Sequence, residues 1–316
     1  MTKTARTVCA LTLIAGMTAL AGCGGGSSPE RTRPLIGVSL LTQTHAFYKD
    51  LEDALRAEAT ARGFDLAVVA CEMDPARQVA QFEDFITQKV DAILAAPCDS
   101  NAIVPSLEAA ELAGIPVFTA DIAARGGKVV SHIASDNVEG GRLAARALAA
   151  RIGESGDVII IDHPEVASVQ DRTRGFDEEI AKHPGVRVVQ RPSASGQRAR
   201  AMAAMEDMLQ AHRGLKGVFG INDDSALGAL AVLDAARRTD IVVVGFDATT
   251  EAQDAIRRGS PLQADVAQNP SLIGRTSIEV IARHLAGEAV DALVAVPVRI
   301  VDATTLAASP AAAPTR

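Results

Sequence analysis

Four polar residues of the sequence share one kind of position, directly after a run of apolar residues typical of a buried strand. They are Asp121, Asp162, Asn222 and Asp247. In open α/β sheets, ligands bind outside the carboxyl ends of the strands. Carboxylate oxygens accept hydrogen bonds, and amides both donate and accept them, as a ligand with many hydroxyl groups requires. Each residue could also cap a helix that follows it, but the set together favours a shared cleft.

Three further side chains could complete such a cleft. Arg172 lies near the start of a helix predicted at 169–182, and its fork of five donors could hold several hydroxyl groups. The alternative is an exposed arginine beside Arg174. Phe47 and Tyr48 follow the first predicted strand, where their rings could stack on the C–H face of a sugar. Core packing is the alternative for both, and it is stronger for Phe47, which heads an apolar helix face.

The sequence gives little support for catalysis. It contains no nucleophile elbow, phosphate loop or dinucleotide fingerprint. His45, His132 and His163 are widely separated and lack the spacing of metal ligands. The formal charge of −8, with no basic stripe, argues against a nucleic-acid surface. We therefore predict a binding protein that is not an enzyme and has neither cofactor nor metal.

The elements that must position these residues alternate between strand and helix. No hairpin signal interrupts the alternation, so the pattern predicts two doubly wound lobes with parallel sheets. The first lobe has predicted strands at 35–41, 66–70, 92–96 and 116–120, with helices at 47–59, 76–88 and 103–113. The second has predicted strands at 157–161, 186–189, 218–221 and 241–246, with helices at 169–182, 199–210 and 226–237.

The passage between the lobes is predicted at 116–152. A strand ends at Asp121, a second extended run follows at 129–133, and residues 135–137 can cap a helix over 138–152. Two later extended pieces, 262–267 and 293–301, are separated by a helix at 271–285 and give the chain opportunities to cross back. We predict a signal peptide at 1–23, a flexible tether at 24–33, a first lobe of 34–135 plus 269–296, a second lobe of 136–268 plus 297–306, and a disordered tail at 307–316.

The first residues carry an export signal. Lys3 and Arg6 precede an apolar run at 8–20 that is too short for a comfortable membrane span. The run ends in Leu-Ala-Gly-Cys at 20–23, which resembles the bacterial lipobox, where the cysteine is lipidated and becomes the mature N-terminus. The alternative is an ordinary secretory signal that contains a cysteine. We predict lipidation of Cys23 and a protein held at the periplasmic or cell-surface side of a membrane by this anchor only.

Cys71 and Cys98 are the cysteines left in the folded body. An exported protein could join them. In a doubly wound sheet, however, their strands would flank the first strand, and two spacings of about 4.7–4.9 Å exceed the roughly 7 Å limit between the Cα atoms of a disulfide. We expect two free, largely buried thiols unless loops bend inward.

The sequence as a whole resembles a known family over nearly all of the predicted mature chain. It looks like the ribose-binding branch of the periplasmic sugar-binding proteins of ABC transporters, with the type I periplasmic-binding fold that lactose-repressor-type regulators share. Such regulators carry an N-terminal helix-turn-helix, where this chain has an export signal. The motifs that carry the resemblance are VVSHIASDN at 129–137, ND at 222–223 with ALGAL at 226–230, VVGFD at 243–247, and AQ at 267–268.

The resemblance implies two lobes, joined by a three-strand hinge, that close on one sugar. The family's stacking aromatics match Phe47 and Tyr48, and its polar ligand contacts match Asp121, Arg172, Asn222, Asp247 and Gln268, with His45 where ribose binders have Asn. Three positions depart from the pattern. Ile122 replaces an arginine, Gly196 an aromatic residue and Leu41 a serine.

These departures put a less hydroxylated sugar, a polyol or another small ligand ahead of ribose. The resemblance further implies a monomer that delivers the ligand to an ABC transporter permease. The alternative is a sensing lipoprotein that presents its ligand-bound form to a chemoreceptor or a histidine kinase.

Overall fold

The computed structural model describes Thr2 and residues 31–308. Cys23, the rest of the predicted signal peptide, most of the predicted tether and residues 309–316 lie outside the described residues. In the described part of the chain, no helix has the length and apolar character needed to cross a membrane.

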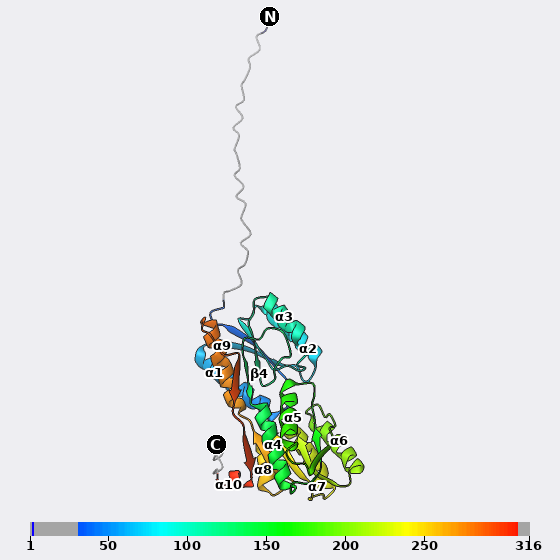
Figure 1. Cartoon of the computed structure of the whole chain (residues 1–316). Coiled ribbons are helices and arrows are strands. Elements are labelled where there is room, and N and C mark those ends of the chain that lie inside the picture. The colour runs from blue at the N-terminus through cyan, green and yellow to red at the C-terminus, as the bar shows by residue number, and fades with distance from the viewer. Residues whose placement is uncertain (1, 3–30, 309–316) are drawn as a thin grey trace. The chain divides into compact units, whose positions relative to one another are not determined.

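The first lobe is built on a fully parallel sheet of six strands within residues 31–308, in the order β11-β5-β4-β3-β1-β2. Figure 1 shows helices α1, α2, α3 and α9 gathered around this sheet. Every residue of β3 and β4 is buried, as in strands covered by helices on both faces. The strands are β1 (Leu35–Leu40), β2 (Asp65–Ala70), β3 (Ala92–Ala95), β4 (Val117–Ala120), β5 (His132–Ser135) and β11 (Leu293–Val296). The helices are α1 (Ala46–Arg62), α2 (Pro75–Gln88), α3 (Val104–Leu112) and α9 (Pro270–Leu285).

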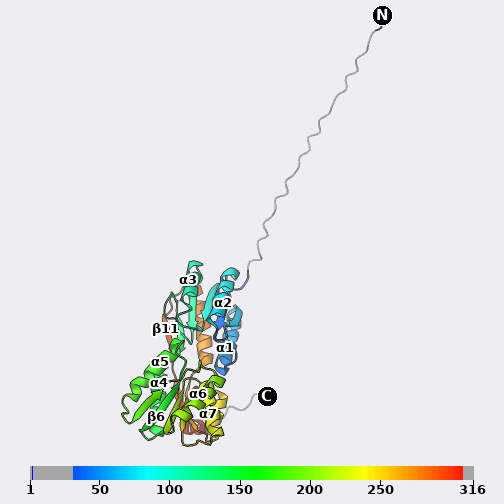
Figure 2. The same ribbon diagram turned by 90° about the vertical axis from the view of Figure 1, so that its right-hand side faces the viewer.

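The second lobe repeats this architecture with the order β12-β10-β9-β8-β6-β7. Only its edge strand β12 runs antiparallel to its neighbour, among the strands described. Helices α4 to α8 surround this sheet, and Figure 2 shows α4, α5, α6 and α7 from the side. The strands are β6 (Gly156–Ile161), β7 (Val186–Gln190), β8 (Leu215–Gly220), β9 (Val242–Asp247), β10 (Leu262–Ala267) and β12 (Arg299–Asp302). The helices are α4 (Asn137–Arg151), α5 (Ala167–Ile180), α6 (Arg198–Ala211), α7 (Asp223–Ala235), α8 (Thr250–Arg257) and α10 (Ala303–Ala308).

The described chain passes between the two sheets three times. It crosses from β5 to α4, from β10 to α9, and from β11 to β12. The predicted extended piece at 293–301 is therefore two strands in different sheets. They are divided at Pro297, which has no N–H to give to a ladder. The prediction of two doubly wound lobes is confirmed.

Helices α4 and α5 pack unusually closely, because glycine faces backbone on both. A Cβ atom at Gly141 would overlap the carbonyl oxygen of Arg172, and one at Gly175 would overlap that of Val138. Beneath them the rings of Phe176 and Phe219 stack, with centroids 4.9 Å apart. The glycines thus bring α5 deep into the lobe and set the position of the Arg172 side chain.

The expectation of free thiols is wrong, because Cys71 and Cys98 form a disulfide with their Cα atoms 6.6 Å apart. Their strands β2 and β3 do flank β1. Both cysteines, however, lie beyond the strand ends, in loops that converge over the end of β1 near Leu41. The spacing of strands within the sheet therefore does not limit the distance between these two cysteines.

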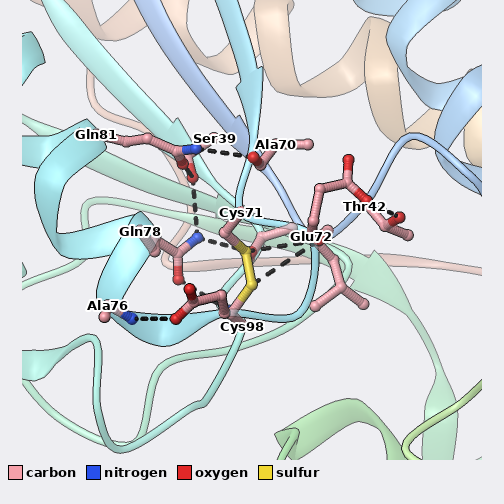
Figure 3. Close-up of a disulfide and its surroundings, with 12 residues drawn as sticks. Ser39, Thr42, Ala70, Cys71, Glu72, Ala76, Gln78, Gln81 and Cys98 are labelled. Atoms are coloured by element: carbon pink, nitrogen blue, oxygen red, sulfur yellow. Dashed lines mark hydrogen bonds between the residues drawn. A yellow bond between two sulfur atoms is a disulfide. The ribbon is translucent and has the colours of Figure 1, made fainter.

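Buried amides of α2 tie the same strand ends together around the disulfide (Figure 3). Gln81 donates a hydrogen bond to the Ala70 carbonyl at 2.8 Å, and Gln78 donates to the Ala96 carbonyl at 3.0 Å. The Ser39 hydroxyl donates to Gln81 Oε1 at 2.7 Å. This edge of the first sheet is therefore fixed both covalently and by hydrogen bonds.

Candidate functional site

A pocket of about 40 Å³ lies where the strands of both sheets end. The structure brings all nine side chains proposed as ligand contacts to this pocket. Its lining residues are Leu41, His45, Phe47, Tyr48, Asp121, Ile122, His163, Val166, Ser168, Val169, Arg172, Ile221, Asn222, Asp247 and Gln268.

The first lobe contributes an aromatic and acidic wall. Tyr48, in the first turn of α1, donates a hydrogen bond to Asp121 Oδ2 at 2.6 Å. The Phe47 ring meets the Tyr48 ring edge-on at 5.2 Å, so one aromatic pair serves both core and pocket. Burial raises the pKa of Asp121 and, together with the neighbouring Asp121 carboxylate, raises the pKa of Tyr48 well above its ordinary value. Asp121 has φ +64°, a left-handed conformation that aspartate tolerates better than most residues.

Arg172 is the central cation of the pocket and not an exposed side chain, since only 3% of it is exposed. Its Nη2 donates to Asn137 Oδ1 at 2.8 Å, its Nε donates to the same oxygen at 3.3 Å, and its Nη1 donates to the Ile221 carbonyl. The guanidinium carbon lies 3.4 Å from the centre of the Phe246 ring. Within the described structure these bonds use three of its five N–H groups, so two remain for a ligand.

Asp247 ends β9 and is a second carboxyl group near the Arg172 guanidinium. Gln268, just beyond β10, donates to Asp247 Oδ1 at 2.7 Å, and the Asp223 N–H lies 3.4 Å from Asp247 Oδ2. Burial and the Asp223 carboxylate raise the pKa of Asp247, while Arg172 opposes the rise. The Gln268 Oε1 atom is buried and has no donor among the described residues. A ligand hydroxyl group can donate a hydrogen bond to this oxygen.

Asn222 serves as a helix cap and lines the pocket at once. Its Oδ1 accepts from the Ser225 N–H at 2.9 Å, and its Nδ2 donates to the Gly196 carbonyl at 3.0 Å. Asn222 therefore has both positions expected from the sequence, as a helix cap and in the pocket lining. Asp162 is different, because its carboxylate accepts from the His163 N–H and the residue bridges to Ser193 outside the pocket.

His163 is the main polar pocket residue that the sequence reasoning did not select. It immediately follows Asp162, so the rule that ligands lie beyond strand ends pointed to the correct loop and the wrong side chain. Burial lowers the pKa of His163. A Cβ atom at Gly196 would lie 3.3 Å from His163 Nδ1, so the histidine ring packs beside this glycine.

Apolar side chains line the pocket together with the polar groups. They include Ile122, which is 1% exposed, and Leu41, at two of the positions that depart from the ribose-binder pattern. The remaining apolar contributors come from the second lobe and are Val166, Val169 and Ile221. The pocket lining therefore combines polar and apolar side chains.

Direct contacts join the two lobes. The Ala167 N–H donates to Ser100 Oγ at 2.8 Å, and Arg125 Nη2 donates to Gln170 Oε1 at 2.9 Å. His45 Nε2 lies 3.4 Å from Asp224 Oδ2, and burial lowers the pKa of this histidine despite the nearby carboxylate. The structure therefore has the lobes closed over the pocket.

No group of three or more histidine, cysteine, aspartate or glutamate side chains within residues 31–308 is arranged to hold a metal ion. The polar side chains of the pocket are hydrogen-bonding groups of mixed type. Their arrangement can hold a small molecule by several directed hydrogen bonds.

Residues 36–289 match the family of the periplasmic binding protein domain. The chain belongs to this family. It is 36% identical to the ribose import binding protein of Bacillus subtilis (strain 168), over 84% of this chain and 86% of the relative. The family confirms the resemblance found in the sequence and the prediction of a binding protein instead of an enzyme.

Solved structures give the same result. An ABC transporter solute-binding protein from Mycobacterium smegmatis with bound glycerol has a TM-score of 0.83 and 36% identity, covering 87% of this chain and 96% of that one. A solute-binding protein from Agrobacterium vitis bound with α-D-tagatopyranose has a TM-score of 0.82 and 31% identity, with the same coverage. Relatives with similar sequence identity to this chain thus have bound molecules of different size.

Proposed function

We propose that this protein is an extracytoplasmic solute-binding lipoprotein, which captures a small sugar or polyol between its lobes and delivers it to an ABC importer. The observation that carries the proposal is the closed pocket in which Asp121, Arg172, Asp247 and Gln268 converge. Family membership supports a transport role, and the ribose import relative supports a carbohydrate ligand.

The polar residues of the pocket are suited to hydroxyl groups. A sugar hydroxyl can donate to a carboxylate and accept from a guanidinium at the same time, and Asp247 and Arg172 offer both partners. The buried Gln268 Oε1 pairs with a further hydroxyl. Two carboxyl groups against one guanidinium favour a neutral ligand over an anionic one.

Pocket size and the apolar lining residues restrict the ligand further. A pocket of about 40 Å³ has room for roughly three to four water molecules. The space therefore favours a short polyol or a small sugar over a disaccharide in the closed state. Ile122 offers no hydrogen bond to a hydroxyl group beside it, which penalises ligands that are hydroxylated all round.

A thermal-shift screen over pentoses, hexoses, polyols, deoxy sugars and nucleosides tests the proposal. The protein is first freed of endogenous ligand by unfolding and refolding. A ligand that binds only the native state at 100 times its Kd adds about 2.7 kcal/mol of stability. The Arg172→Ala variant, which lacks the central cation, is the control and should lose the shift. If acidic metabolites raise the Tm and no sugar or polyol does, the proposed ligand class is wrong.

A further inference from the structure

Two buried carboxyl groups lie behind Asp247, outside the pocket lining. Asp223 begins α7 and is 3% exposed, and Asp265 lies in the middle of β10 and is fully buried. Asp265 pairs in register with Gly245 of β9. A Cβ atom at residue 245 would overlap Asp265 Oδ2 and approach Asp223 Oδ1 at 3.1 Å, so the glycine makes room for both carboxyl groups.

One oxygen of each carboxyl group holds the turn that follows β9. Asp265 Oδ1 accepts from the Ala248 N–H at 3.0 Å, and Asp223 Oδ2 accepts from the Thr249 N–H at 2.7 Å. In this turn Asp247 has φ +118° and Ala248 has φ +54°. Residues in such strained conformations persist only where their surroundings hold them.

The other oxygen of each group needs a hydrogen-bond partner. Asp223 Oδ1 and Asp265 Oδ2 are buried and have no N–H or O–H donor among the described residues. Both oxygens lie close to the same point, the Cβ position of residue 245, so they are near each other. Two ionised carboxylates only accept, so a hydrogen bond between these oxygens requires a proton on one of them.

Electrostatics agree with this arrangement. Burial raises the pKa of Asp223, to about 6, and burial together with the Asp223 charge raises the pKa of Asp265 well above its ordinary value. A buried pair of like charges loses its first proton readily and holds the second strongly, as one coupled unit.

We propose that Asp223 and Asp265 share one proton at neutral pH, and that this hydrogen-bonded pair positions Asp247 for the ligand. The proposal rests on the proposed function in taking Asp247 as a ligand contact. Asp223 and Asp265 are positioning residues: they contact the backbone that carries Asp247 and do not line the pocket.

Three other charged groups act on the pair, namely Asp224 on α7, Asp247 on β9 and Arg172 on α5. Asp121 after β4 and Tyr48 on α1 act on Asp247 and Arg172. Arg172 lies on the Asp247 side, where it favours the ionised form of that carboxylate. When rising pH removes the shared proton, the pair becomes doubly charged and repels itself. The turn at 247–249 then loses its fixed anchor.

Carbon-13 NMR of the full chain, labelled at the aspartate side-chain carboxyl carbons and free of ligand, tests the proposal over a pH titration. The wild-type protein should show two carboxyl signals that titrate together, with one proton retained above the ordinary aspartate range. The Asp247 signal should move again when the pair loses that proton.

The Asp265→Asn variant separates positioning from mere packing. Its amide can donate to the Asp223 carboxylate without sharing a proton, so Asp223 should titrate within or below the ordinary range. The second movement of the Asp247 signal should disappear. Asp223→Asn is the reciprocal variant, with the same expected loss. Asp234→Asn, an exposed change on the same helix, should leave the wild-type titration intact.

Ordinary titration of both carboxyl groups in the wild-type protein would overturn the shared proton. An Asp247 signal that is unaffected by the pair, or that moves equally in Asp265→Asn, would overturn the positioning role. Because the measurement uses no ligand, these results are independent of the thermal-shift screen. A failure of the proposed ligand class would appear only in that screen.

Discussion

Replacing both cysteines of the disulfide with serine should lower the free energy of unfolding by about 3.6 kcal/mol. Cys71 and Cys98 are separated by 27 positions, so the disulfide closes a loop of about 28 residues. Loop-closure entropy for such a loop is roughly 12 cal/mol/K, which gives about 3.6 kcal/mol at 25 °C. Serine is the best replacement because Leu41 O lies close to both sulfur atoms and can accept a hydrogen bond from a serine hydroxyl.

Urea unfolding with and without a reductant measures this loss. The reduced wild-type protein should approach the stability of the Cys71→Ser/Cys98→Ser variant, while the reductant should leave that variant unchanged. The double variant should still fold, because Gln78 and Gln81 continue to join the strand ends by hydrogen bonds. A loss below about 1 kcal/mol, or a wild-type protein insensitive to reductant, would show that the cross-link does not constrain the unfolded chain as argued.

Four further predictions follow from the sequence and the site. Cys23→Ala should leave the protein unprocessed or release it into the soluble fraction, and normal membrane retention would contradict the lipid anchor. Asp247→Ala and Arg172→Ala should each weaken binding of the best ligand from the screen by about 1.5–3 kcal/mol, roughly ten- to a hundredfold by calorimetry; wild-type affinity in either variant would refute its assignment. Because the pKa of Asp223 is raised to about 6, its contribution to stability is fully present below about pH 4 and is lost as pH rises through 6. Urea midpoints should show this loss, and the slope should flatten in Asp223→Asn. Ile122→Arg should improve ribose binding relative to polyols and deoxy sugars; tightest binding of ribose by the wild-type protein would contradict the specificity argument.

The sequence was sufficient to predict the fold because each element carries its own local pattern. Buried parallel strands appear as short apolar runs, and helices repeat apolar residues every three or four positions. Residues directly after the runs then fall at one edge of each sheet. Asp121, Asn222 and Asp247 reach the same pocket for this reason. Asp162 does not reach the pocket, because it still pairs with Ser193 in a β-bridge. Its neighbour His163 lines the pocket instead.

Features set by contacts between loops or between neighbouring strands lay beyond the local patterns. The disulfide depends on how two loops bend over β1, which no periodicity encodes. Asp265 is harder still, because in the sequence it is a single acidic residue in an apolar run. The role proposed for Asp265 depends on the strand register, which places Gly245 opposite it. It also depends on the start of α7, which brings the Asp223 carboxyl group to the same space. A buried acid with a glycine across the ladder is therefore a pattern that only the paired strands reveal. In the proposed arrangement, the proton shared by Asp223 and Asp265 controls how firmly the strained turn that carries Asp247 is held.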